Sequence, residues 1–223
     1  MKILAIETSG DWCSVALWRD GVIFERDMRA QQRQSGHVID LAHDLLNAQG
    51  ECLQGMDGFA FGAGPGAFTG LRIACGVVQG FALGADKPVV GVSTLLALAQ
   101  GSSAARAICC IDARMNEVYH AAYERHGGDW SVVCEPGVYA AQDVPALPGG
   151  SWQGCGNGFA VYPDILRARY GEQVTLVHDA LYPRARDIAA LALPRFVRGE
   201  GVAAEHAVPH YVRDRVALKM SER

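Results

Sequence analysis

The chain places glycine and proline where a phosphate could bind. Residues 59–72 read FAFGAGPGAFTGLR, in which an apolar run is followed by four glycines around one proline and then by a helix-like segment. Glycine-rich turns between a strand and a helix bind phosphates, because the N–H groups at the start of the helix point at the anion. The GxGxxA spacing also matches the outline of a dinucleotide-binding fingerprint. The chemistry to test here is therefore nucleotide or phosphate binding.

Two features that usually accompany such a loop are missing. The next strand-like run, PVVGVST, ends in hydroxyl side chains rather than in the acid that contacts a ribose, and no lysine stands where a phosphate loop needs one. The pattern therefore favours glycines that form a structural turn. Gly64, Pro65 and Gly66 stay as candidates for a vestigial nucleotide or phosphate contact.

A second candidate for phosphate chemistry follows the first apolar run, KILAI. In sugar kinases, actin and Hsp70 relatives, an aspartate with small hydroxyl and glycine neighbours occupies this place and handles metal and phosphate. Here the corresponding residues are Glu7, Thr8 and Ser9, and the bulkier Asp11 and Trp12 come next. We interpret these first three residues as a weakened, vestigial phosphate turn.

Histidine spacing indicates no metal site. His206 and His210 have the HxxxH spacing that brings two imidazoles to one face of a helix, but Pro209 lies between them and disfavours a helix. In an extended segment, residues four apart are separated by ~13 Å, too far for one metal ion. His37 and His43 are six residues apart and point to different helical faces. We therefore predict no metal ligands, and the sequence contains no GxSxG elbow.

Composition places the chain among ordinary globular proteins. Half of the residues are hydrophobic and 20% are charged, and the net charge of −4 argues against a surface that binds nucleic acid unaided. The seven cysteines show no CxxC spacing, which is typical of reduced thiols in a cytoplasmic protein. The first apolar run is too short for a signal peptide, and no run approaches the ~20 apolar residues of a membrane span. We expect a cytoplasmic protein without a membrane segment.

One predicted helix carries a ridge of glycines. Residues 69–85 have only two large polar side chains, and Gly76, Gly80 and Gly84 repeat every four residues. Each glycine lowers helix stability by up to ~1 kcal/mol relative to alanine, and close approach of another backbone is the usual compensation. Two interpretations stay open: packing within the same domain, or an interface with another subunit.

A second helix, predicted at residues 36–48, gathers its apolar side chains on one face and would complete such an interface. The residues predicted at the partner interface are His37, Val38, Leu41, Leu45, Leu71, Ile73, Gly76, Val77, Gly80 and Gly84.

The order of predicted elements repeats along the chain. After the small, polar stretch GSSAA, a strand, an acid, a turn and two more strands recur, with Ile3 matching Ile108 and Glu7 matching Asp112 at an offset of 105. A duplicated α/β unit is therefore predicted. The predicted parts are an N-terminal lobe at 1–102, a smaller second lobe at 103–185, and a C-terminal helix and tail at 186–223 that packs back across the lobes.

These segments together resemble the TsaB (YeaZ) family, the accessory subunits for making N6-threonylcarbamoyladenosine in bacterial tRNA. The resemblance covers the whole chain, and its segments are MKILAIETSGDWCSVALW, residues 36–48, GAGPGAFTGLRIACGVVQGFALG, PVVGVSTLLALA, DARMNEVYHAAY and PHYVR. It implies two actin/Hsp70-like lobes of the RNase H-like (ASKHA) fold, in agreement with the internal repeat.

The resemblance also implies a role without catalysis. TsaB proteins resemble the catalytic TsaD, whose metal-binding HMxGH motif would place its histidines at Thr94 and Leu98 of this chain, and leucine cannot bind a metal. A pseudoenzyme is therefore implied, with no catalytic and no metal-binding residues, that acts as scaffold and activator for threonylcarbamoyl transfer to the adenosine next to the anticodon.

The partners implied by the resemblance are TsaD, paired through helices 36–48 and 69–85, and the ATPase TsaE. No cofactor is expected to bind this chain firmly, and ATP or ADP would lie at the interface of the complex. tRNA would be contacted through the complex, and Arg213 and Arg215 near the C-terminus are candidates for direct contact. Alone, the chain would form a homodimer through the same helices.

Two other functions stay open at the level of sequence. A small-molecule kinase or ATPase with an actin-like fold would bind a nucleotide between its lobes. A metalloprotease would bind a metal ion.

Overall fold

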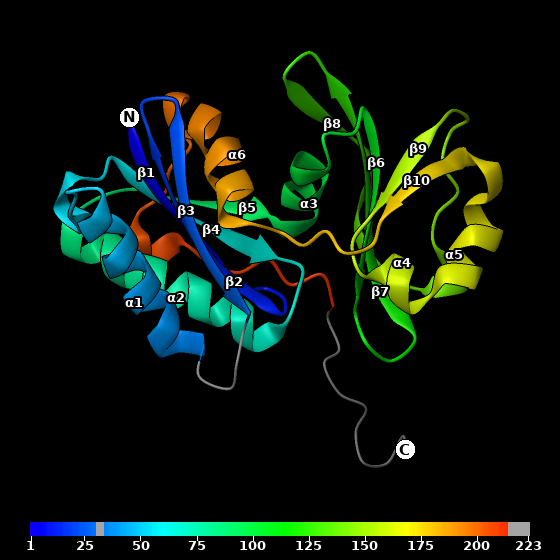
Figure 1. Cartoon of the computed structure of the whole chain (residues 1–223), viewed down its shortest axis with the longest axis horizontal. Coiled ribbons are helices and arrows are strands. Elements are labelled where there is room, and N and C mark those ends of the chain that lie inside the picture. The colour runs from blue at the N-terminus through cyan, green and yellow to red at the C-terminus, as the bar shows by residue number, and fades with distance from the viewer. Residues whose placement is uncertain (30–33, 214–223) are drawn as a thin grey trace.

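The computed structural model describes residues 1–29 and 34–213. Within these ranges the chain forms two lobes that lie side by side, each built on a five-stranded mixed sheet (Figure 1). The strands of the first sheet come from residues before 94, and those of the second sheet from residues 106–178. The fold class predicted from the sequence, a duplicated α/β architecture, is confirmed.

The first sheet has the order β3-β2-β1-β4-β5. An antiparallel meander of β1 (Lys2–Glu7), β2 (Trp12–Arg19) and β3 (Val22–Arg29) is extended by β4 (Gly58–Gly64) and β5 (Val89–Ser93), which run parallel to β1. Strands β1 and β4 are buried along almost their whole length, because helices cover both faces of the sheet. This explains why their sequences are continuous apolar runs rather than alternating ones.

The second sheet repeats this arrangement in the order β10-β9-β6-β7-β8. Its meander is β6 (Arg106–Asp112), β7 (Glu117–His126) and β8 (Asp129–Ala140), and β9 (Trp152–Cys155) and β10 (Val174–His178) are added in parallel. Each strand therefore occupies the same place in its sheet as its counterpart in the first lobe.

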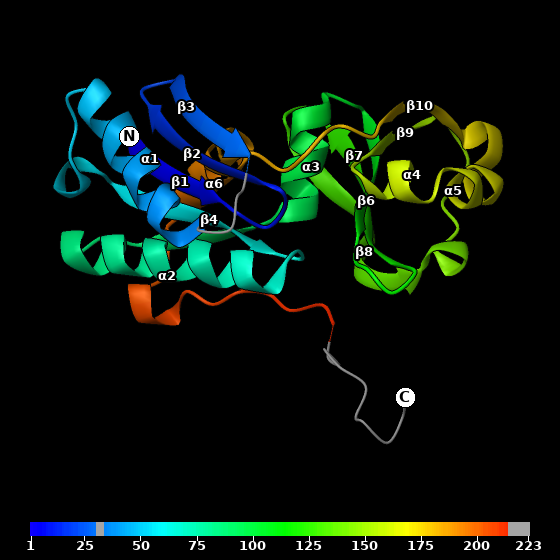
Figure 2. The same ribbon diagram turned by 60° about the horizontal axis from the view of Figure 1, so that its bottom comes forward.

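Helices cover both sheets on both faces. On the first sheet, α1 and α2 cover one face and α6 covers the other; on the second sheet, α4 and α5 lie opposite α3 (Figures 1 and 2). The α1 and α2 helices begin two residues and one residue earlier than predicted. The helices and the short 3-10 turns are α1 (Gln34–Ala48), η1 (Leu53–Gly55), α2 (Phe68–Ala85), α3 (Thr94–Ser102), η2 (Ala141–Asp143), α4 (Gly158–Val161), α5 (Pro163–Tyr170), η3 (Gly171–Gln173), α6 (Ala185–Val197) and η4 (Ala204–His206).

The last helix of each repeat packs on the sheet of the other repeat. Helix α3 follows β5, yet Leu95 and Leu98 pack with Cys109 and Tyr123 of the second sheet. Helix α6 follows β10, yet it packs against β1 and β2, and the two helices contact each other between the lobes. The lobes thus share a buried apolar layer, while the residue limits assigned to the three predicted parts stay a prediction.

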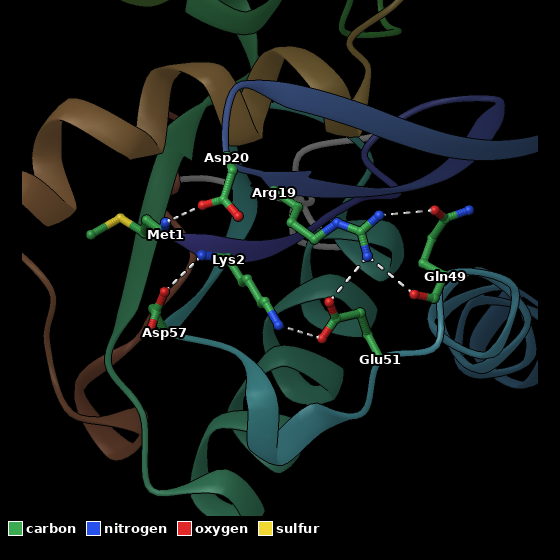
Figure 3. Close-up of polar contacts among 7 residues, drawn as sticks. All are labelled: Met1, Lys2, Arg19, Asp20, Gln49, Glu51 and Asp57. Carbon is green, nitrogen blue, oxygen red and sulfur yellow. Dashed lines mark hydrogen bonds and ion pairs between the residues drawn. The ribbon is translucent and has the colours of Figure 1, made fainter.

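A network of ion pairs lies at the end of the first sheet where β1 begins (Figure 3). The side chains of Lys2 and Arg19 both reach Glu51, at 2.8 and 3.1 Å, and the amine of Met1 lies 2.9 Å from Asp20. These contacts tie the β1–β2 hairpin to the chain that follows α1. The residues singled out for chemistry lie at the opposite end of β1.

Candidate functional site

The ends of β1 and β6 meet at a cleft between the two lobes, with a volume of about 390 Å³. Its lining includes the turn after β1, the glycine loop and the start of α2, the turn after β6, and the chain after η4. The vestigial phosphate turn and the glycine loop predicted from the sequence are therefore brought together.

The two lobes build the same turn at this cleft. One carboxylate oxygen of Glu7 accepts a hydrogen bond from the N–H of Ser9 at 2.5 Å. In the second lobe a carboxylate oxygen of Asp112 accepts one from the N–H of Arg114 at 3.0 Å. In both cases an acid at the end of a strand stabilises the turn two residues later. The pairing of Glu7 with Asp112, inferred from the sequence repeat, is confirmed by this geometry.

Glu7 itself is buried, and only its neighbours line the cleft. Its side chain is 1% exposed, and burial raises its pKa to about 7, although hydrogen bonds from Ser9 partly offset the effect. The second carboxylate oxygen lies against the backbone of Gly62 and has no hydrogen-bond partner among the described residues. A carboxyl group in this position is poorly suited to hold a metal ion in the cleft.

The glycines of the loop make room for the turn after β1. A Cβ atom at Gly70 would overlap the carbonyl oxygen of Thr8, and one at Gly66 would lie 2.6 Å from the Cβ of Ser9. The hydroxyl of Thr8 donates to the carbonyl of Gly70 at 2.7 Å, and the N–H of Ala67 donates to the carbonyl of Ser9 at 2.7 Å. These contacts support the structural interpretation of the glycines; a residual phosphate contact at residues 64–66 stays a prediction.

The two positions that the sequence resemblance matches to the histidines of an HMxGH motif are in the core. Thr94 is fully buried and donates its hydroxyl to the carbonyl of Pro65, and Leu98 is fully buried in an apolar cluster. His206 lies in η4 and His210 in the segment after it, and both are exposed. Among residues 1–29 and 34–213, no group of three or more histidine, cysteine or acidic side chains could hold a metal ion.

The glycine ridge of α2 faces open space. At Gly76, Gly80 and Gly84, no heavy atom of the described chain lies within 4 Å of the position that a Cβ would take. Packing of this ridge within the same domain, one of the two interpretations left open, is therefore not found among residues 1–29 and 34–213, and an interface with another subunit stays a prediction. Leu83 is 75% exposed on the same helix, and Ile39 is 38% exposed on α1.

Comparison with known proteins assigns the chain to a family. The family profile described as "TsaD: tRNA N6-adenosine threonylcarbamoyltransferase" matches residues 28–220. The "tRNA threonylcarbamoyladenosine biosynthesis protein TsaB" of Escherichia coli (strain K12) is 38% identical, with 98% of this chain and 97% of the relative aligned. The chain belongs to the TsaB family. The TsaB protein of Haemophilus influenzae is 31% identical over 98% of the chain and 96% of its own length.

The fold agrees with a solved structure of the same family. The structure of "YeaZ from Pseudomonas aeruginosa" superimposes with a TM-score of 0.84 at 36% sequence identity, covering 94% of this chain and 99% of that one. The order of strands and helices described above is therefore that of a TsaB/YeaZ protein along almost its whole length.

Part of the interface predicted for this TsaB-family chain must be corrected. Val38, Leu45 and Leu71 are only 0–2% exposed, so their side chains are not available to a partner on the outer face of α1 and α2. Val38 and Leu45 belong to the core cluster that helical periodicity identifies, whereas Leu71 lies beside the glycine loop at the cleft. The predicted positions that do reach the surface are His37, Leu41, Ile73, Gly76, Val77, Gly80 and Gly84.

Helix α2 is apolar enough to raise another possibility. Its 18 residues have a mean hydropathy of 1.3, which by length and composition alone would suit a membrane span, although core helices of soluble proteins meet the same criterion. In the structure, α2 packs on β4 and is flanked by α1, η1 and η4, while the face that carries Gly76, Gly80 and Gly84 is exposed. The apolar side chains of α2 thus contribute to the core on one side, and the opposite side is not covered by any of residues 1–29 and 34–213.

Sequence reasoning missed an aromatic cluster at the start of α2. The guanidinium of Arg72 lies 3.9 Å from the centre of the Phe68 ring, and the Tyr211 ring lies 5.5 Å from that of Phe68. The spacing of Phe68 and Arg72 along a helix could have indicated their contact. Nothing in the sequence near them indicates Tyr211, 139 residues beyond Arg72.

Of the two candidates for tRNA contact, Arg213 is already engaged within the chain: its guanidinium pairs with Glu117 and donates to the carbonyl of Ala113. Arg215 lies outside the described residues.

The second lobe contains a counterpart of the glycine loop that sequence reasoning overlooked. The segment GCGNG at residues 154–158 was its signal in the sequence. In the structure, Gly156 and Gly158 pack against Cys110 of β6.

Proposed function

We propose that this chain is a non-catalytic scaffold and activator subunit that pairs with a TsaD-type transferase during threonylcarbamoylation of the adenosine next to the anticodon in tRNA. The observation that carries the proposal is the open glycine ridge of α2, flanked by exposed apolar side chains. Glycine destabilises an isolated helix, so three glycines with open space above them in the described part of the chain are best explained by a partner that packs closely against them.

The cleft supports a role without catalysis. Glu7 replaces the aspartate that handles metal in nucleotide-binding relatives, and its burial raises the pKa of the carboxyl group, which disfavours the charged form that a metal ion would need. Neither Thr94 nor Leu98 offers a ligand to a metal of the TsaD type, and the chain's own residues 210–213 line the cleft. The reaction is therefore assigned to the partner, and this chain stabilises the active arrangement of the complex.

The remaining parts of the complex follow from the same proposal. The ATPase TsaE joins the pair, ATP or ADP occupies the interface of the complex, and tRNA is bound through it, because a chain with a net charge of −4 attracts nucleic acid weakly. In the absence of the transferase, two copies of the chain pair through the same face of α1 and α2. The complex acts in the cytoplasm.

Replacement of Gly80 by leucine tests the interface. The larger side chain fills space that a partner would need, so we expect Gly80→Leu to weaken binding to the TsaD-type partner by about 1–3 kcal/mol in calorimetry. Gly128→Leu is the matched control, since Gly128 also faces open space but lies in the turn between β7 and β8 of the other lobe. Equal affinity of the two variants would contradict the interface.

Reconstituted tRNA modification tests the role itself. The modification is expected to require both this chain and the transferase, and the chain alone is expected to show no activity. Modification at full rate by the transferase and TsaE without this chain would refute the scaffold proposal.

The cleft also favours a second candidate, a small-molecule kinase or ATPase. The cleft lies between two actin-like lobes, as the nucleotide site of such enzymes does, and both β1 and β6 end in an acid. Tight binding of ATP and magnesium by the chain alone, followed by phosphate release, would support this function.

The third candidate, a metalloprotease, predicts that elemental analysis of the purified chain finds a bound metal.

A further inference from the structure

The chain after η4 runs along α2 and then reaches the second lobe (Figure 2). Its start is fixed on α2: the carbonyl oxygen of Ala207 accepts hydrogen bonds from the thiol of Cys75 at 3.2 Å and from the side-chain amide of Gln79 at 2.8 Å. Three residues later, the N–H of His210 donates to the carbonyl of Ala63 at the end of β4, at 2.7 Å. Residues 207–210 are therefore held by both helix and sheet of the first lobe.

The glycine loop is shaped to receive this segment. Gly64 has a φ of 116°, a backbone conformation that other residues rarely adopt, and a Cβ atom there would lie 2.6 Å from the carbonyl oxygen of His210. One glycine of the loop that resembles a phosphate cradle thus makes room for the chain's own backbone.

The end of the segment is fixed on the second lobe. The guanidinium of Arg213 donates to the carbonyl of Ala113 at 3.0 Å and pairs with the carboxylate of Glu117. It also lies 5.8 Å from the centre of the Tyr119 ring, and its side chain is only 18% exposed. A charged group held by a carbonyl, a carboxylate and an aromatic face is ordered rather than free in solvent.

Arg213 is attached beside a strained turn. Residues 114–116, which connect β6 to β7, all have positive φ angles, of 62°, 56° and 60°. Such conformations are unfavourable for arginine and methionine and persist only where the surrounding contacts hold them. The carbonyl of Ala113 and the carboxylate of Glu117 are the groups on either side of this turn that Arg213 joins.

Because its two ends are fixed on different lobes, the segment spans the cleft, and residues 210–213 line it. Between the ends, the hydroxyl of Tyr211 accepts a hydrogen bond from Arg72 at 3.1 Å and its ring packs on Phe68, on the exposed start of α2. A change in the separation of the lobes would therefore pull on Phe68 and Arg72, which lie on the same face of α2 as the glycine ridge because they continue its four-residue spacing.

We propose that residues 207–213 are a clasp that holds the two lobes closed over the cleft and links the width of the cleft to the exposed start of α2. The closure itself does not depend on the proposed function. The link to α2 does rest on the proposed function, because it assumes that α2 binds a partner. Through the clasp, a change in the separation of the lobes would reach that helix.

Hydrogen exchange of the chain alone tests the closure. Arg213→Ala removes the contact with the second lobe, so we expect the amide of His210 and the amides of residues 113–117 to exchange about tenfold faster, with α1 and α6 unchanged. Glu117→Gln is expected to act in the same direction, and Arg213→Lys to restore part of the protection. The matched control is Arg198→Ala, which removes an exposed arginine paired with Glu200. Wild-type exchange in Arg213→Ala would overturn the clasp.

Binding to the TsaD-type partner tests the link. If the clasp positions the start of α2, Arg213→Ala is expected to weaken binding severalfold although Arg213 lies off the glycine ridge. Faster exchange with unchanged affinity would refute the link and leave the closure. The interface on α2 is tested separately by Gly80→Leu, so failure of the clasp and failure of the proposed function give different results.

Discussion

The carboxyl group of Glu7 lies where its charge is disfavoured, and stability should depend on pH as a result. Burial raises its pKa from 4.5 to about 7, because the charged form loses its hydration. Between these two values the folded chain binds more protons than the unfolded chain. The contribution of Glu7 to the free energy of unfolding therefore falls as pH rises from about 4.5 to 7, by up to about 1.4 kcal/mol per pH unit, and then levels off.

Glu7→Gln tests this dependence. The amide keeps an acceptor for the N–H of Ser9 but does not ionise, so we expect the variant to gain stability relative to the wild type as pH rises from 5 to 7. Burial also raises the pKa of Asp187 on α6 to about 7, and Asp187→Asn should remove a second part of the same slope. Urea unfolding at several pH values measures both, and parallel curves for variant and wild type would contradict the prediction.

At the scale of elements, α2 contains glycines of two kinds. Gly70 faces the backbone of Thr8, whereas Gly76 faces open space. We expect Gly70→Ala to lower the free energy of unfolding by about 1–3 kcal/mol or more, because the methyl group meets backbone that cannot move aside. Gly76→Ala should raise it by about 0.5–1 kcal/mol, because alanine favours the helix. Denaturant titration of the two variants measures both changes in the free energy of unfolding. Changes of the same sign would show that α2 packs on the first lobe in a different orientation.

The same helix shows how far sequence reasoning reaches at this scale. Apolar composition and the position of the glycine loop predict α2 to within one residue at its start. The functions of its glycines were not predictable, because spacing within a helix identifies a shared face but not what lies opposite that face. The structure separates Gly70, packed on Thr8, from Gly76, Gly80 and Gly84, which contact nothing in the described chain.

At the scale of the whole molecule, the two lobes should respond to acid in opposite directions. His120 lies in the core of the second lobe next to the Tyr170 hydroxyl, and burial lowers its pKa from 6.5 to about 4. Between these values the unfolded chain binds more protons, so the contribution of His120 to stability is lost as pH falls from about 6.5 to 4. The contributions of Glu7 in the first sheet and Asp187 in α6 to stability instead increase as pH falls over much of the same range.

We therefore expect the second lobe to open more readily than the first at pH 5, and the difference to narrow at pH 7. Hydrogen exchange resolved by lobe measures this, after correction for the intrinsic effect of pH on exchange. His120→Gln should reduce the pH dependence of hydrogen exchange in the second lobe. His126→Gln, at an exposed histidine of the same strand, should leave it unchanged. Equal acid sensitivity of both lobes in the wild type would refute the prediction.

The sequence by itself determined the repeated α/β unit, the places of the strands and helices, and the family, because these depend on local patterns of apolar residues and on motifs of a few adjacent residues. Only the tertiary structure decided which residues of each pattern are buried and which face solvent. It buries Val38, Leu45 and Leu71, leaves the glycine ridge open, and encloses Glu7 behind the loop. It also brings Arg213 to Glu117, 96 residues away, across the cleft. Contacts between residues so far apart arise from the packing of whole elements, which no local spacing records.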